Sequence, residues 1–142
     1  MSSIKIGFDF HGVLDSDPAF FASLIRQLKA TGNEIHILTG QEHSDKLVAE
    51  LSDLCIVYDQ LFSITTYHKK KGTYVTYKNE DLTQPLIAPP TWDRTKADYA
   101  SMVGLDFHID DSVEYGQYFT GRRTQYLIYT PQLRILLKSL FR

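Results

Sequence analysis

Short apolar runs alternate along this chain with stretches whose apolar residues recur at helical spacing. "IKIGFD" at residues 4–9 and "EIHILTG" at 34–40 are compact runs of strand length, which is typical of buried strands. The stretch between them repeats its apolar residues as one face of a helix does: Phe20, Phe21, Leu24, Ile25 and Leu28. The pattern predicts a strand, a helix and a second strand, in that order.

Residues at the expected helix ends support this alternation. Asp17 can cap the first helix with Pro18 at its first position, and Gly32 can end it. Three more helices are predicted: one from about Ser44, one around residues 93–103, and one that starts at Thr130 and Pro131. Two of these have apolar residues at helical spacing: Leu47, Val48, Leu51 and Leu54 in the first, and Leu133, Leu136, Leu137 and Leu140 in the last.

The remaining apolar runs predict three more strands and a short helix. "LFSITTY" at 61–67 is the expected third strand, although "CIVYD" at 55–59 competes with it. "DFHID" at 106–110 and "TQYLIY" at 124–129 follow, separated by a short helix at 112–119. Strands that alternate with helices predict an α/β fold: a doubly wound, mainly parallel, Rossmann-like sheet of about five strands, with helices on both faces.

Residues 68–91 interrupt the alternation. They combine a basic run, a β-rich piece, polar residues and three prolines, which predicts a surface insertion that forms a loop or a small β-hairpin. The insertion is too short to be a full cap domain. With no internal repeat and no obvious linker, residues 1–142 are expected to form a single domain.

Composition and charge narrow the class of protein. The 142 residues include 15 Lys and Arg against 17 Asp and Glu, and the net charge of -2 argues against general nucleic-acid binding. One cysteine allows no internal disulfide. No apolar segment has the length of a signal peptide or of a membrane span, so we expect a soluble, cytoplasmic protein that does not bind membranes.

The predicted strands end in polar residues that can carry chemistry. Asp9 follows the first strand, Thr39 and Gly40 follow the second, and Asp110 and Asp111 follow the fourth. Lys96 is expected on or near the helix that leads into the fourth strand. Because ligands of open α/β sheets bind at the carboxyl ends of the strands, these groups are expected to meet at one edge of the sheet.

Such a group of side chains fits a phosphoryl group beside a metal ion. Carboxylates that meet repel one another unless a cation lies among them, and oxygen ligands of this kind suit Mg²⁺. A hydroxyl with neighbouring backbone N–H groups and a lysine suits phosphoryl oxygens. Asp9 would then be placed to attack phosphorus and form an aspartyl-phosphate. Taken one at a time, these residues are also ordinary helix caps, turns and solvated side chains.

Four short motifs resemble those of the haloacid dehalogenase-like phosphatase superfamily. "DFHGVL" looks like the first motif and "HILTG" like the second, while Lys96 in "WDRTKADY" is similar to the third and "HIDDS" to the fourth. The resemblance covers most of the chain, in the order of the family, and the first and fourth motifs are the most specific. It implies a hydrolase with a Rossmann-like fold that has Mg²⁺ as its cofactor.

The resemblance also implies a role for each site residue. Asp9 would be the nucleophile, and Mg²⁺ would be held by Asp9, by the backbone carbonyl of His11 and by Asp110. Asp111 would act through a metal-bound water. The phosphoryl oxygens would be held by the side chains and backbone at Thr39, Gly40 and Lys96.

Receiver domains of response regulators share these parts in another order. There the acidic pair follows the first strand and the lysine comes last. Here a single aspartate, Asp9, comes first, and the acidic pair follows Lys96. The order favours the phosphatase superfamily.

His11 stands where the phosphatases of this superfamily have a second aspartate, which is their general acid and base. Imidazole can do the same work, because its usual pKa of about 6.5 lies near neutral pH. In one hypothesis His11 is therefore the acid–base catalyst of a phosphomonoesterase. In the other it is a structural or gating residue, and the protein is a noncatalytic or very slow phosphate- or metal-binding module.

The expected partner is a phosphorylated substrate. With no full cap domain the site would be open, which suits either a macromolecular substrate or a small one covered by a neighbouring subunit of a homo-oligomer. A phosphotransferase built on the same site is a third possibility.

Overall fold

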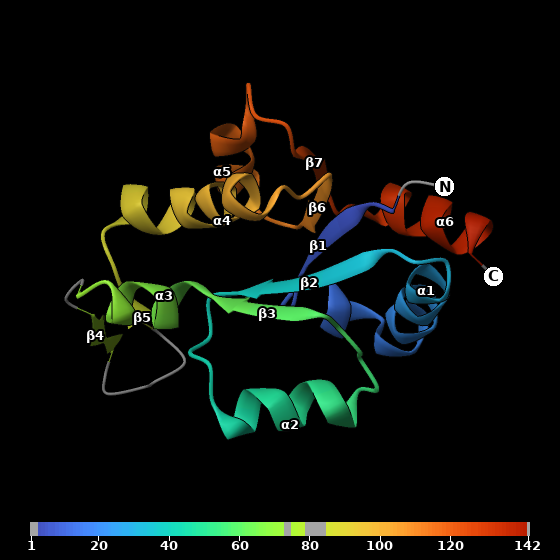
Figure 1. The fold of residues 1–142 in the computed structure, drawn as a ribbon, viewed down its shortest axis with the longest axis horizontal. Coiled ribbons are helices and arrows are strands. Elements are labelled where there is room, and N and C mark those ends of the chain that lie inside the picture. Colours follow the sequence, from blue (N-terminus) through green and yellow to red (C-terminus); the bar gives the residue numbers. More distant parts are fainter. Residues whose placement is uncertain (1–2, 73–74, 79–84, 142) are drawn as a thin grey trace.

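A computed structural model describes residues 3–72, 75–78 and 85–141, and it contains a parallel five-stranded sheet (Figure 1). Its strands are β1 (Lys5–Asp9), β2 (Glu34–Thr39), β3 (Gln60–Ser63), β6 (Phe107–Asp110) and β7 (Gln125–Ile128). They are ordered β3-β2-β1-β6-β7, so β1 lies at the centre. The predicted α/β, Rossmann-like fold is confirmed.

Helices cover both faces of the sheet. They are α1 (Pro18–Ala30), α2 (Asp45–Asp53), α3 (Ile64–Lys70), α4 (Pro89–Val103), α5 (Val113–Gly116) and α6 (Pro131–Leu140), with short 3-10 turns at Leu14–Ser16 and Gln117–Phe119. Residues of α1 and α2 pack with Phe8 and Ile37 in one core cluster. Residues of α4 pack with Leu38 in another, on the opposite face. None of the helices in the described ranges is long and apolar enough to cross a membrane.

The prediction of a third strand at 61–67 is correct only for residues 61–63. β3 ends at Ser63, and the chain enters α3 at Ile64. The Ser63 side chain accepts a hydrogen bond from the backbone N–H of Thr66 and so caps α3, which outweighs the strand preference of the β-branched residues in "LFSITTY". The competing run at 55–59 forms no strand.

The insertion at 68–91 is shorter than expected and contains the small hairpin. Its first residues belong to α3 and its last to α4. Between them, β4 (Thr76–Tyr77) and β5 (Pro85–Leu86) pair antiparallel. Residues 73–74 and 79–84 of the predicted insertion lie outside the described residues.

The capping prediction for Asp17 is wrong. Asp17 forms no side-chain cap on α1; its carboxylate instead accepts hydrogen bonds from Arg134 and Lys138 of α6, at 2.8 Å each. The predicted starts of α2 and α6 are confirmed, and there the side chains of Ser44 and Thr130 cap the two helices. Asp17 therefore joins two helices that are distant in the sequence.

Candidate functional site

The sheet register brings the predicted strand-end residues to one edge. Asp9 lies opposite Leu38, one residue before Thr39, and Phe8 lies opposite Ile109, one residue before Asp110. A cavity of about 250 Å³ opens there. It is lined by Asp9, His11, Thr39, Gly40, Gln41, Trp92, Lys96, Asp111, Ser112 and Tyr115. The structure thus brings together every predicted site residue, with Asp110 buried beside the cavity.

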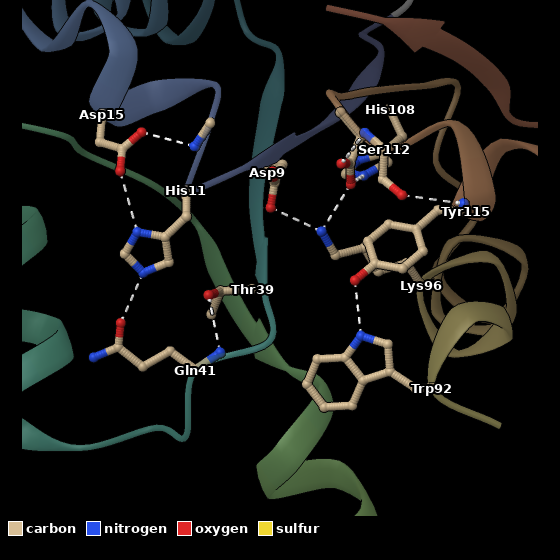
Figure 2. Close-up of polar contacts among 12 residues, drawn as sticks. Asp9, His11, Asp15, Thr39, Gln41, Trp92, Lys96, His108, Ser112 and Tyr115 are labelled. Atoms are coloured by element: carbon tan, nitrogen blue, oxygen red, sulfur yellow. Dashed lines mark hydrogen bonds and ion pairs between the residues drawn. The ribbon is translucent and has the colours of Figure 1, made fainter. Parts of the chain in front are cut away.

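Lys96 bridges two of the carboxylates (Figure 2). Its side chain is only 2 % exposed on α4, and its Nζ donates to Asp9 Oδ1 at 2.8 Å and to Asp110 Oδ2 at 2.7 Å. The ring of Tyr115 lies 4.9 Å from the same Nζ. A buried lysine stays charged when it is paired in this way, so Lys96 supplies a fixed positive charge at the wall of the cavity.

Asp110 is held by donors on both of its oxygens. Oδ2 accepts from Lys96 and from Nε2 of His108 at 2.9 Å, and Oδ1 accepts from the backbone N–H of Ser112 at 3.1 Å. His108 is fully buried. Its hydrogen bond helps to fix the orientation of the Asp110 carboxylate.

The pKa values show where negative charge is in excess. Burial raises the pKa of Asp9 to about 7; Lys96 opposes this rise, and the Asp110 and Asp111 carboxylates add to it. Burial also disfavours ionised Asp110, but the Lys96 charge and the His108 hydrogen bond outweigh it and lower its pKa below the usual range. The Lys96–Asp110 pair is therefore charged, whereas burial and the neighbouring carboxylates make ionisation of Asp9 unfavourable.

The donor set fits a divalent cation. Carboxylate oxygens of Asp9, Asp110 and Asp111 lie within 4.8 Å of one another. The ammonium group of Lys96 pairs with two of the three carboxylates, those of Asp9 and Asp110. Oxygen ligands with a net negative charge suit Mg²⁺. This chemistry is compatible with the predicted Mg²⁺ ligands.

The turn after β1 places Asp111 close to the backbone. Gly12 has a positive φ of 95°, and a Cβ at this position would lie 2.1 Å from Oδ2 of Asp111. Any larger residue would therefore displace the Asp111 carboxylate. The close approach of Asp111 explains why a glycine stands at this position of "DFHGVL".

On the other wall, Thr39 offers a hydroxyl to the cavity. Its side chain is 1 % exposed, and Oγ1 accepts from the backbone N–H of Gln41 at 3.1 Å. A hydroxyl that accepts one hydrogen bond still has its own proton to donate. The carbonyl of Gly40 accepts from Thr65 Oγ1 at 2.6 Å, which anchors this turn to α3.

His11 lies at the exposed side of the cavity and is held by two partners. Nδ1 is 3.1 Å from Asp15 Oδ2, and Nε2 is 2.9 Å from Gln41 Oε1. The ring stacks on Phe10 at 4.4 Å. Burial lowers the pKa of His11, but the hydrogen bonds to Gln41 and Asp15 and the charges of Asp15 and Asp9 outweigh it and raise the pKa above the usual 6.5. Acceptors at both ring nitrogens favour imidazolium, the form that can donate a proton.

Five residues of this site were given no role from the sequence: Asp15, Gln41, Trp92, Ser112 and Tyr115. Helical spacing offers a signal for one of them, because Trp92 lies one turn before Lys96 on α4 and so on the same face. Gln41 directly follows the Thr39–Gly40 turn. No comparable pattern points to Tyr115.

Comparison with known proteins supports the fold only. No protein-family model matches the chain, and a search of curated proteins also finds no match. The chain is similar to a solved structure of an uncharacterized protein from Corynebacterium glutamicum, with 15% sequence identity and a TM-score of 0.60. The similarity covers 98% of this chain and 93% of the other. The chain therefore has an α/β fold that is also found in a protein of unassigned function.

Proposed function

We propose that this protein is a Mg²⁺-dependent phosphomonoesterase that acts through an aspartyl-phosphate on Asp9. The proposal depends mainly on the surroundings of Asp9. Its Oδ1 is held by Lys96, while its Oδ2 has no hydrogen bond within the described ranges and its side chain lines the cavity. A carboxylate that is fixed through one oxygen and free at the other is suited to attack phosphorus.

The reaction would have two steps. In the first, an oxygen of Asp9 bonds to phosphorus, the ester P–O bond breaks, and the leaving alcohol takes a proton from imidazolium His11. In the second, neutral His11 accepts a proton from a water molecule while the water oxygen bonds to phosphorus and the bond between the Asp9 oxygen and phosphorus breaks. Inorganic phosphate is released, and the carboxylate of Asp9 and the charged form of His11 are restored.

Other residues of the cavity would hold the phosphoryl group. Lys96 lies 2.8 Å from the nucleophile and provides a fixed charge, and the Thr39 hydroxyl has a proton to donate. Mg²⁺, held by Asp9, Asp110 and the backbone carbonyl of His11, with Asp111 bound through water, would neutralise charge on the phosphoryl oxygens. The excess carboxylate charge supports this part of the proposal.

One observation favours the noncatalytic alternative. Both ring nitrogens of His11 are engaged, by Asp15 and by Gln41, and neither is bonded to Asp9. To protonate a leaving group, Nε2 must exchange Gln41 for the substrate. If that exchange does not occur, the site would bind phosphate and metal without turnover.

Hydrolysis of 4-nitrophenyl phosphate, with Mg²⁺ and with EDTA, tests the proposal. We expect phosphate release that needs the metal and falls by at least about 1,000-fold in Asp9→Asn. Asp53→Asn, on the exposed surface of α2, is the matched control and should keep full activity. Acid quenching followed by mass spectrometry should find phosphate on the peptide that contains Asp9. Equal rates for Asp9→Asn and the wild type would refute the mechanism.

A further inference from the structure

Trp92 is the shared wall of two cavities. One is the polar cavity of about 250 Å³ that contains Asp9. The other has a volume of about 510 Å³ and is lined by Leu86, Ile87, Ala88, Pro89, Trp92 and Asp93. The indole of Trp92 therefore lies between the cavity that contains Asp9 and a second, mostly apolar cavity.

The indole is fixed in place before any ligand binds. Its Nε1 donates to the hydroxyl of Tyr115 at 2.7 Å (Figure 2). The opposite edge lies against Gly40, where a Cβ would be only 2.5 Å from Cζ2 of Trp92. Gly40 thus allows the indole to lie across the turn that follows β2. A ring that is already ordered loses little entropy when another ring packs on it, so Trp92 is suited to stacking.

The second cavity is mostly apolar, and the described residues that line it include no lysine, arginine or histidine. Most of its lining is aliphatic, and Leu86 is 53% exposed there. Asp93 is its single titratable lining residue within the described ranges, and burial and the charge of Glu114 raise the pKa of Asp93. An alcohol with a further phosphate or carboxylate would bring negative charge toward Asp93 with no cation to balance it.

We propose that this site selects phosphomonoesters of aromatic alcohols that are neutral or positively charged, with the aromatic ring packed on Trp92. This inference rests on the proposed function, since it takes the phosphoryl group to lie at Asp9. Trp92 is then the residue that determines specificity for the leaving group. Nucleotides and sugars with additional phosphates are disfavoured, because the described lining of the second cavity is mostly aliphatic and offers Asp93 but no cation.

Binding of phosphonates, which cannot be hydrolysed, tests this inference separately from turnover. With Mg²⁺ present, calorimetry should show that benzylphosphonate binds about tenfold more tightly than methylphosphonate and about threefold more tightly than cyclohexylmethylphosphonate. A 4-aminomethyl group on the benzyl ring should preserve this affinity, and a 4-carboxy group should abolish most of the gain. Trp92 is the single tryptophan of the chain, so its emission should change with benzylphosphonate and not with methylphosphonate.

Variants at Trp92 complete the test. Trp92→Ala should reduce the benzyl-to-methyl ratio to about one, while Trp92→Phe should retain most of it. Equal affinity of the wild type for the benzyl and methyl compounds, or an unchanged ratio in Trp92→Ala, would overturn the inference and leave the phosphatase proposal intact. If the wild type prefers benzylphosphonate but hydrolyses no phosphomonoester, the inference about Trp92 is supported and the proposed phosphatase activity is contradicted. If no phosphonate binds, both proposals are overturned.

Discussion

The two halves of the site differ in how far their charged side chains are buried, and therefore in how much those charges contribute to stability. On one side Lys96 and Asp110 are 2% and 0% exposed and form short hydrogen bonds. On the other, His11 and Asp15 are 53% and 40% exposed. A buried charge without a partner is costly, whereas an exposed one is solvated by water. Changes in the buried half should thus alter both stability and binding, and changes in the exposed half should alter catalysis alone.

Lys96→Met should have the largest effect on folding. It removes the ammonium group that neutralises Asp9 and Asp110, and leaving buried carboxylates unpaired costs about 3–5 kcal/mol. Urea unfolding without metal should show this loss, and Lys46→Met, whose lysine is 73% exposed, should unfold like the wild type. Mg²⁺ should restore part of the stability, because it supplies positive charge to the same carboxylates. If Lys96→Met unfolds at the wild-type urea concentration, the bridging lysine is not needed for stability.

In the buried half, His108→Phe removes the hydrogen bond that orients Asp110 and keeps a ring in the same place in the core. Phenylalanine can keep the ring contacts with Phe119 and Tyr126 but cannot donate to Asp110. We expect a loss of about 1–3 kcal/mol in stability. The affinity for Mg²⁺, measured by calorimetry, should fall about tenfold, because the partner that orients a metal ligand is lost.

A second buried histidine provides the control. His36 is 1% exposed and is hydrogen-bonded to Tyr99 and Glu34. It has no hydrogen bond to the Asp9, Asp110 or Asp111 carboxylates within the described residues. His36→Phe should also reduce stability, yet it should leave Mg²⁺ affinity unchanged. Equal losses of Mg²⁺ affinity in the two variants would argue that His108 acts through the core and not through Asp110.

In the exposed half, Asp15→Asn should affect catalysis with little change in stability. Asp15 holds Nδ1 of His11 and also accepts from the backbone N–H of Gly12 at 2.7 Å. An exposed pair of this kind contributes about 0–1 kcal/mol to folding. Alkyl phosphates, whose leaving groups need a proton, should be hydrolysed about tenfold more slowly, while 4-nitrophenyl phosphate should change little. A uniform loss across all leaving groups would show that His11 does not act as the general acid.

The same contrast explains how much of the molecule could be predicted from sequence. Parallel strands bring their carboxyl ends to one edge, so the positions of Asp9, Thr39 and Asp110 follow from the order of the elements. The contacts of these residues do not follow, because they depend on how α4 and the turn after β2 pack together. Trp92 is an example: its role needs both the bond to Tyr115 and the missing side chain at Gly40.

Asp17, outside the site, gives the smallest effect and a reference for ion pairs with partly exposed partners. Its side chain is 17% exposed and is bonded to Lys138 and Arg134. The hydrogen bond from Lys138 lowers the pKa of Asp17 against a small opposing effect of burial, and Arg134 adds to the lowering. Because the folded pKa lies below the unfolded value of 3.8, the ionised carboxylate stabilises the fold above pH 3.8.

Asp17→Asn should therefore lose about 0.5–1 kcal/mol at pH 7, measured by urea unfolding. The difference from the wild type should shrink as the pH falls through the folded pKa, since the wild-type carboxylate then becomes neutral as well. Asparagine caps helices about as well as aspartate, so a capping role would leave stability at pH 7 almost unchanged. A difference that appears at pH 7 and disappears in acid would thus assign Asp17 to the contact between α1 and α6. A loss as large as that of Lys96→Met would mean that burial does not decide how strongly an ion pair of this protein contributes to stability.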